Sequence, residues 1–233
     1  MHKFIILIFL ILIYSCVQAQ KKEIVIVAFG NSTTAKRKGV ERVYAQRLHK
    51  KLDSAGIKNK VINSGVGSSH TGSIKDNDFA KVAHAMDRFD KAVLRYHPDW
   101  VIINFGLNDA YQDNGVNTIS RIPLKYYKKN ILFFIKNIKR QHGRIILLPP
   151  NPQTSKYEEF RRERVKQYAN AVRKISKCRN TYLIDSWKIF NDWGKDKPLG
   201  IDHLFLDKLH PNDEGHRLIS DKLSEIIIGY YIN

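Results

Sequence analysis

The chain has 233 residues, of which 43% are hydrophobic and 27% charged, and its formal net charge is +18. This length suits one α/β domain with its own core, and the composition excludes an intrinsically disordered protein. The positive charge favours anionic partners, but the Lys and Arg residues are spread along the chain and no nucleic-acid recognition motif accompanies them. We therefore expect no nucleic-acid partner.

The chain opens with MHKFIILIFLILIYSCVQAQ, in which residues 4–13 form an unbroken apolar run. That run is too short to span a bilayer but is typical of a secretory signal. Two processing routes remain open: residues 1–19 form a cleaved signal peptide, or residues 1–15 form a lipoprotein signal followed by a lipidated Cys16. Either route predicts export from a bacterial cytoplasm, with any membrane contact made through the lipid. Residues 20–233 are then expected to form a single domain.

Along the rest of the chain, short apolar runs alternate with longer amphipathic segments. The apolar runs predict buried strands and the amphipathic segments predict helices. This alternation is typical of a parallel sheet with helices on both faces, so we expect a three-layer α/β/α fold with five strands. The expected strands are 23–29, 60–63, 100–105, 144–150 and 181–187, and the expected helices are 40–56, 78–96, 123–143, 157–176 and 211–228.

Small and polar residues follow the first three expected strands and precede the last expected helix. Ligands of such sheets bind at the carboxyl ends of the strands, so these segments are candidates for one site. They read GNST at 30–33, NSGVGSSH at 63–70, GLND at 106–109 and DKLHP at 207–211.

These residue types suit nucleophilic catalysis. A serine hydroxyl needs a base to take its proton, and a histidine held by a carboxylate is suited to that task near neutral pH. Asp207 and His210 are three residues apart, so one turn can place both on the same side. Attack on an ester builds an oxyanion, and each preplaced N–H donor to it contributes roughly 3–4 kcal/mol. Each segment alone is more often a turn or a helix cap. The prediction of a catalytic site therefore depends on finding all four segments in this order.

The same four segments resemble the SGNH/GDSL hydrolase family. The resemblance implies a flavodoxin-like fold and ester hydrolysis through an acyl-serine, without a cofactor or a metal. Carried over by position, Ser32 is the nucleophile and also an oxyanion donor through its backbone N–H. Asn108 is the side-chain oxyanion donor, His210 is the base, and Asp207 orients the base.

Two positions depart from the family pattern. Asn31 stands where the family usually has Asp, which keeps an acceptor oxygen but removes a charge. Ser68 stands where the family usually has the oxyanion-hole Gly. A backbone N–H can still donate from Ser68 if its φ and ψ suit a side chain, and Gly67 is the alternative donor.

The family resemblance is greatest to carbohydrate esterases, because the fourth expected strand ends in Pro150-Asn151-Pro152, expected to form one wall of the cleft. We therefore expect a serine esterase that removes acyl groups, with acetyl favoured, from carbohydrate. The basic balance suggests an anionic polysaccharide. The alternatives are a lysophospholipase or thioesterase acting on longer acyl chains, and a degenerate glycan-binding protein. His70 is expected on a surface loop and His216 against the last helix.

Overall fold

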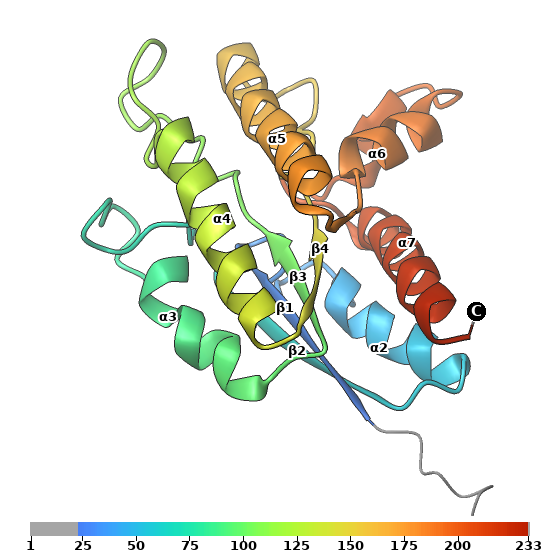
Figure 1. Cartoon of the computed structure of the whole chain (residues 1–233). Coiled ribbons are helices and arrows are strands. Elements are labelled where there is room, and N and C mark those ends of the chain that lie inside the picture. Colours follow the sequence, from blue (N-terminus) through green and yellow to red (C-terminus); the bar gives the residue numbers. More distant parts are fainter. Residues whose placement is uncertain (1–22, 233) are drawn as a thin grey trace, which may run out of the picture.

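A computed structural model describes residues 23–232, and the expected export signal and Cys16 lie outside this range. The centre of the fold is a five-stranded parallel sheet in the order β2-β1-β3-β4-β5 (Figure 1). This is the strand order of flavodoxin-like folds. The strands are β1 (Ile24–Gly30), β2 (Asn59–Gly65), β3 (Trp100–Asn104), β4 (Arg144–Leu147) and β5 (Tyr182–Leu183).

Helices cover both faces of the sheet, and α2 and α7 lie side by side on one of them (Figure 1). None of the helices within residues 23–232 combines the length and apolar composition needed to cross a bilayer. The α-helices are α2 (Tyr44–Ser54), α3 (Ala85–Ala92), α4 (Leu124–Arg140), α5 (Glu159–Arg179), α6 (Ser186–Gly194) and α7 (Asp213–Ile232), and two 3-10 helices span Leu94–Tyr96 (η1) and Gly200–Leu204 (η2).

The core is split into two apolar layers by the sheet. Successive side chains of a strand point to opposite faces, so Val27 and Phe29 of β1 pack with α3, α4 and α5. Ile26 and Ala28 pack on the other face, with α2, α6 and α7. All four side chains are fully buried. The predicted three-layer α/β/α fold is therefore confirmed.

Two expected elements differ most from the structure, and the strand expected over 144–150 ends earlier, at Leu147. The helix expected over 78–96 is shorter, because residues 78–84 form an irregular loop before α3, and Lys81 in that loop has a φ of +50°. The strand expected over 181–187 was wrong beyond Leu183. Asp185 instead caps α6, since its carboxylate accepts hydrogen bonds from the backbone N–H groups of Trp187 and Lys188. Neither α6 nor η2 was predicted.

Candidate active site

Ser32 lies in a tight turn directly after β1. Asn31, whose side chain is 1% exposed, closes the turn: its Oδ1 accepts a hydrogen bond from the Thr33 N–H at 3.0 Å. Its backbone carbonyl accepts from the N–H groups of Thr34 and Ala35 at 3.1 and 3.0 Å. The neutral amide thus supplies the acceptor that this turn requires, and the departure from Asp at this position leaves the turn closed.

Gly30 is required where β1 enters this turn. A Cβ at Gly30 would lie 2.0 Å from Thr34 Oγ1 and 2.7 Å from the carbonyl oxygen of Asn104, which leaves no room for a side chain. The close packing of the turn against β3 holds Ser32 at the carboxyl edge of the sheet.

Ser32, His210 and Asp207 meet at this edge, although 174 residues of chain lie between the serine and the aspartate. Ser32 Oγ lies 2.9 Å from His210 Nε2, and His210 Nδ1 lies 2.8 Å from Asp207 Oδ2. Asp207 Oδ1 also accepts hydrogen bonds from the backbone N–H groups of Leu209 and His210, at 2.8 and 2.7 Å. The imidazole is therefore held between a hydroxyl and a carboxylate, the arrangement that prepares a serine for nucleophilic attack.

The surroundings favour the neutral form of the His210 imidazole, which is the form that a general base requires. Burial lowers the pKa of His210 below its ordinary value, the nearby Arg37 cation lowers it further, and the hydrogen bond with Asp207 opposes both. Burial would raise the pKa of Asp207, but the hydrogen bonds from His210 and Leu209 hold that pKa below its usual range. Arg37 Nη2 lies 3.5 Å from Asp207 Oδ2. Sequence reasoning missed Arg37, because it is one of many dispersed basic residues.

The expected oxyanion donors lie on the loops after β2 and β3. Ser68 is exposed and has a φ of +60°, the left-handed region that glycine adopts more readily than serine. Asn108 Nδ2 donates to the carbonyl of Ser69 at 3.0 Å, which joins the two loops. Within residues 23–232, the backbone N–H groups of Ser32 and Ser68 bond to no protein acceptor, and neither Ser68 nor Asn108 hydrogen-bonds to Ser32.

Asn151 connects the turn of Ser32 to the loop of His210. It is 1% exposed; its Oδ1 accepts from Thr33 Oγ1 at 3.2 Å, and its Nδ2 donates to the carbonyl of Leu209 at 3.0 Å. The turn around Asn151 was expected to form a wall of the cleft, but Asn151 itself is a buried support beneath the Ser32–His210 pair. No residue pattern around it indicated these two partners.

His70 is fully buried, which corrects the expectation of a surface position. Its ring stacks on His84 with centroids 3.4 Å apart, and its Nε2 lies 3.0 Å from the carbonyl oxygen of Asn77. Next to it, the Thr71 N–H donates to the buried carboxylate of Asp109 at 2.8 Å. These contacts hold the loop that carries Ser68 rather than presenting His70 to a substrate.

Comparisons with known proteins decide the family. The model of the GDSL-like Lipase/Acylhydrolase family matches residues 28–218, most of the chain. The chain belongs to this family. It is therefore a carboxylic ester hydrolase, as the sequence motifs predicted.

The relatives include carbohydrate esterases. An acetylxylan esterase from Geobacillus stearothermophilus is 23% identical over 163 residues, which cover 69% of this chain and 68% of that protein. A crystal structure of an acetylxylan esterase from the same organism superposes with a TM-score of 0.69 at 21% identity, covering 89% of this chain and 96% of that one. A lipase/acylhydrolase from Enterococcus faecalis gives a TM-score of 0.70 at 25% identity, with coverage of 89% and 96%. These structures support the fold assignment.

Proposed function

We propose that this esterase removes acetyl groups from carbohydrate through an acyl-enzyme on Ser32. The observation that supports this proposal most directly is the continuous hydrogen-bonded series from Ser32 through His210 to Asp207. The acetylxylan esterase among its relatives supports the substrate class. A degenerate binding protein would have no need of this complete series.

In the proposed reaction, Ser32 Oγ attacks the ester carbonyl while His210 Nε2 takes the hydroxyl proton. Asp207 stabilises the imidazolium that forms. The oxyanion accepts hydrogen bonds from the backbone N–H groups of Ser32 and Ser68 and from the side chain of Asn108. When the intermediate collapses, the sugar oxygen leaves with the proton from His210. A water molecule, deprotonated by His210, then attacks the acyl-serine and releases acetate.

The test is acetate release by the purified protein from acetylated xylan, acetylated pectin and p-nitrophenyl acetate. We expect release from at least one polysaccharide, and its loss in Ser32→Ala, whose folding is checked by circular dichroism. The proposal fails if no acetate is released, or if Ser32→Ala releases it at the wild-type rate.

A lysophospholipase or thioesterase activity is the second candidate, and the likeness to a lipase/acylhydrolase of 25% identity favours it. The same catalytic groups would serve, so chain length separates the two. A series of p-nitrophenyl esters from acetyl to palmitoyl should show a sharp optimum at acetyl. An optimum at eight carbons or more would favour the second candidate.

We also propose that the protein acts outside the cytoplasm, because the apolar run of residues 4–13 is typical of an export signal. Mass spectrometry of the protein from a bacterial host separates the two processing routes. A chain that starts at Gln20 indicates signal-peptide cleavage, and a chain that starts at a diacylated Cys16 indicates a lipoprotein. An unprocessed chain found in the cytosol would contradict export.

A further inference from the structure

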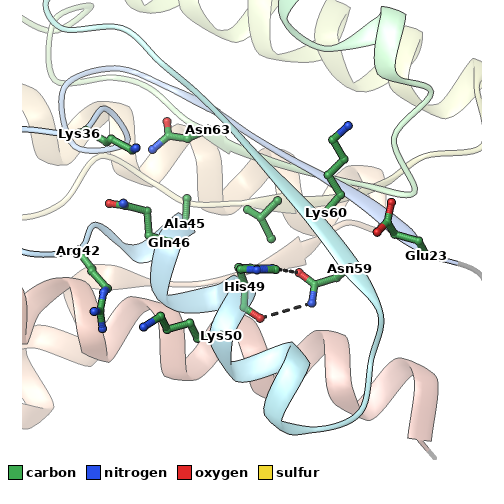
Figure 2. A pocket seen from close by; sticks show the side chains of 11 residues that line it. Glu23, Lys36, Arg42, Ala45, Gln46, His49, Lys50, Asn59, Lys60 and Asn63 are labelled. Carbon is green, nitrogen blue, oxygen red and sulfur yellow. Dashed lines mark hydrogen bonds between the residues drawn. The ribbon is translucent and has the colours of Figure 1, made fainter.

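A groove separate from the Ser32–His210 pair lies between α2 and β2, the edge strand of the sheet (Figure 2). It encloses about 650 Å³. The groove runs along β2 from Asn63 to Asn59. Because four residues of a strand rise about 13 Å, the groove is about that long. A groove of this length accommodates a segment of a chain molecule rather than a single small ion.

One end of the groove adjoins the turn of Ser32. Lys36 and Asn63 lie close together at that end, whereas Lys60 and Glu23 lie at the other (Figure 2). Asn63 Nδ2 donates a hydrogen bond to the carbonyl of Thr34 at 2.7 Å, which fixes this wall to the segment two residues after Ser32. A chain that occupies the groove can therefore continue towards the catalytic edge.

The groove is strongly cationic. Lys36, Lys50 and Lys60 line it, are exposed, and have no carboxylate partner within residues 23–232. Arg42 also lines the groove but pairs with Glu41, with a nitrogen–oxygen distance of 3.1 Å. Glu23 is the acidic residue of the lining. Three cations without counter-ions around one concave surface raise the local concentration of anions.

The lining favours a polyanionic sugar chain over a nucleic acid. None of the described residues that line the groove is Phe, Tyr or Trp, so the aromatic surface on which unpaired bases could stack is limited to the ring of His49. Its free cations are lysine ammonium groups, which act as point charges and suit dispersed carboxylates. Val61 provides apolar surface, and Gln46 provides a side-chain amide that can contact hydroxyl groups.

We propose that this groove binds uronic-acid carboxylates of an anionic polysaccharide while an acetylated unit of the same chain reaches Ser32. This inference rests on the proposed function for its substrate class. The three free lysines come from the loop after Ser32, from α2 and from β2, so the fold brings together charges that the sequence disperses.

Binding measured by calorimetry tests the inference, with Ser32→Ala as the background so that hydrolysis does not enter the result. The probes are oligogalacturonate and neutral xylo-oligosaccharide of equal length. The groove variant is Lys36→Gln/Lys50→Gln/Lys60→Gln. The matched control is Lys128→Gln/Lys129→Gln/Lys136→Gln, which removes the same charge from exposed positions on α4, on the opposite side of the sheet.

We expect oligogalacturonate to bind at least tenfold more weakly to the groove variant and within twofold of the parent to the control. Binding should weaken as NaCl rises from 0.05 to 0.5 M, because the Debye length falls from more than 10 Å to less than 5 Å over this range. A variant with Arg at all three groove positions keeps the charge and should keep binding.

Three results would overturn the inference: equal losses in the groove and control variants, equal affinity for the neutral oligosaccharide, or tighter binding of a single-stranded oligonucleotide at the same lysines. Failure of the proposed function gives a different result. In that case wild-type protein releases no acetate, whatever the oligogalacturonate affinity.

Discussion

At the position before Ser32, the chain has a buried neutral amide instead of a carboxylate. Asn31 keeps the hydrogen bond that closes the turn but adds no negative charge beside His210, the proposed base. The charged side chains that act on the His210 imidazole are therefore Asp207, which favours its protonated form, and Arg37, which disfavours it. We therefore propose that Arg37 tunes the pKa of His210.

Replacing Arg37 by Gln should raise the pKa of His210. Burial and the Arg37 cation both lower that pKa, so removing the cation moves it back towards its ordinary value. Because the base must be neutral, the acid limb of kcat/KM against pH should move to higher pH. Hydrolysis of p-nitrophenyl acetate between pH 4.5 and 9 measures this shift. Arg37→Lys keeps the charge and should keep the wild-type limb; a limb that stays in place or moves to lower pH in Arg37→Gln would refute this role.

Replacing Asn108 should reduce kcat far more than it changes KM. Loss of one oxyanion donor typically lowers kcat by about 10²–10³-fold, and we expect a loss of this size for Asn108→Ala. Asn108→Asp has nearly the same shape but cannot donate to the oxyanion or to the Ser69 carbonyl, which Asn108 reaches at 3.0 Å. It should be at least as impaired. Steady-state kinetics with p-nitrophenyl acetate test both variants, and a loss below tenfold in Asn108→Ala would exclude the donor role.

The catalytic residues that the sequence predicts are those whose side-chain type itself suits the chemistry. Ser32, Asp207 and His210 could be proposed because a hydroxyl, a carboxylate and an imidazole followed or preceded expected elements. Arg37 and Asn151 could not be proposed in these roles, because each acts through a contact with a distant segment that only the fold creates.

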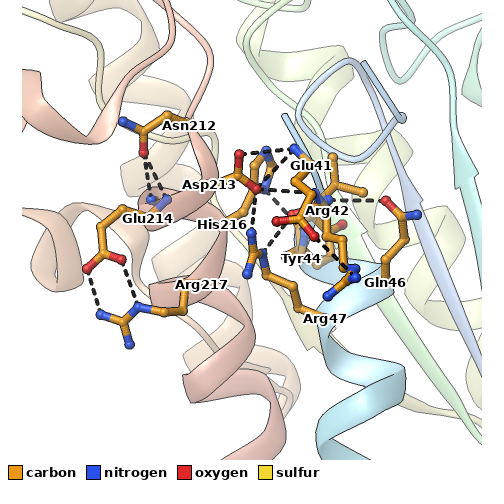
Figure 3. Close-up of polar contacts among 12 residues, drawn as sticks. Glu41, Arg42, Tyr44, Gln46, Arg47, Asn212, Asp213, Glu214, His216 and Arg217 are labelled. Atoms are coloured by element: carbon orange, nitrogen blue, oxygen red, sulfur yellow. Dashed lines mark hydrogen bonds and ion pairs between the residues drawn. The ribbon is translucent and has the colours of Figure 1, made fainter. Parts of the chain in front are cut away.

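Between elements, α7 is tied to the start of α2 (Figure 3). Asp213 lies three residues after His210. Its carboxylate accepts hydrogen bonds from the backbone N–H groups of Glu41 and Arg42, just before α2, and from the guanidinium of Arg47. Tyr44 of α2 donates its backbone N–H to His216 Nδ1 at 3.3 Å. The Tyr44 hydroxyl lies 2.8 Å from Thr34 Oγ1, in the turn of Ser32. The helix that follows His210 is thus connected through α2 to the turn of Ser32.

Asn151 connects the turn of Ser32 directly to the loop of His210. Asn151→Ala should therefore lower both the unfolding free energy and kcat. The variant leaves the Leu209 carbonyl without its side-chain donor, and an unsatisfied buried group costs about 1–3 kcal/mol of unfolding free energy. The Ser32–His210 hydrogen bond loses a support on each side, so kcat should also fall. Urea unfolding and p-nitrophenyl acetate kinetics measure the two effects.

Asn151→Asp is the informative comparison for this prediction. It keeps the acceptor for Thr33 Oγ1 but loses the donor to Leu209, so it should lower kcat in the same direction as Asn151→Ala. If both variants keep wild-type kcat while stability falls, Asn151 supports the fold without positioning His210.

Element boundaries were predicted less well than element order. The five strands and their parallel arrangement follow from apolar runs that alternate with amphipathic segments, and the structure confirms them. The run from Thr181 to Trp187 was misinterpreted because its apolar residues suit a strand, while Asp185 within it is a helix cap. A single capping carboxylate decides that boundary, and periodicity does not detect it.

For the whole molecule, the formal charge of +18 could be counted, but its distribution could not. Lys36, Lys50 and Lys60 come from a loop, a helix and a strand, and their shared groove exists only after β2 pairs with β1 and α2 packs beside it. The sequence thus predicts a preference for anionic partners, but only the tertiary structure shows which surface would bind them.

The pH dependence of stability is also a property of the whole fold, because ionisable groups are buried on both sides of the sheet. Burial lowers the pKa of His70 to about 4 and the pKa of His216 to about 3, and it raises the pKa of Asp109 to about 6. Below pH 6.5 the unfolded chain binds protons at the two histidines that the folded chain does not, so the unfolding free energy falls as pH falls. Between pH 6 and 4 the contribution of Asp109 to the unfolding free energy has the opposite sign, because its carboxylate binds a proton at higher pH in the folded chain than in the unfolded chain. This contribution offsets part of the loss.

Replacing His216 isolates one of these contributions. In His216→Asn the side-chain oxygen can take the place of Nδ1 as acceptor for the Tyr44 N–H, while the titrating ring is removed. Near pH 7.5 the variant should be less stable, because a smaller side chain occupies a fully buried site. Below pH 6.5 the wild type then loses about 1 kcal/mol of unfolding free energy for each unit of pH, and the variant does not. The difference in unfolding free energy should therefore move in favour of the variant by about 2 kcal/mol between pH 6.5 and 4.5. Urea unfolding at several pH values measures this difference, in which the contributions of Asp109 and His70 cancel. A difference that stays constant with pH would mean that the folded protein accommodates a protonated His216 beside Arg47.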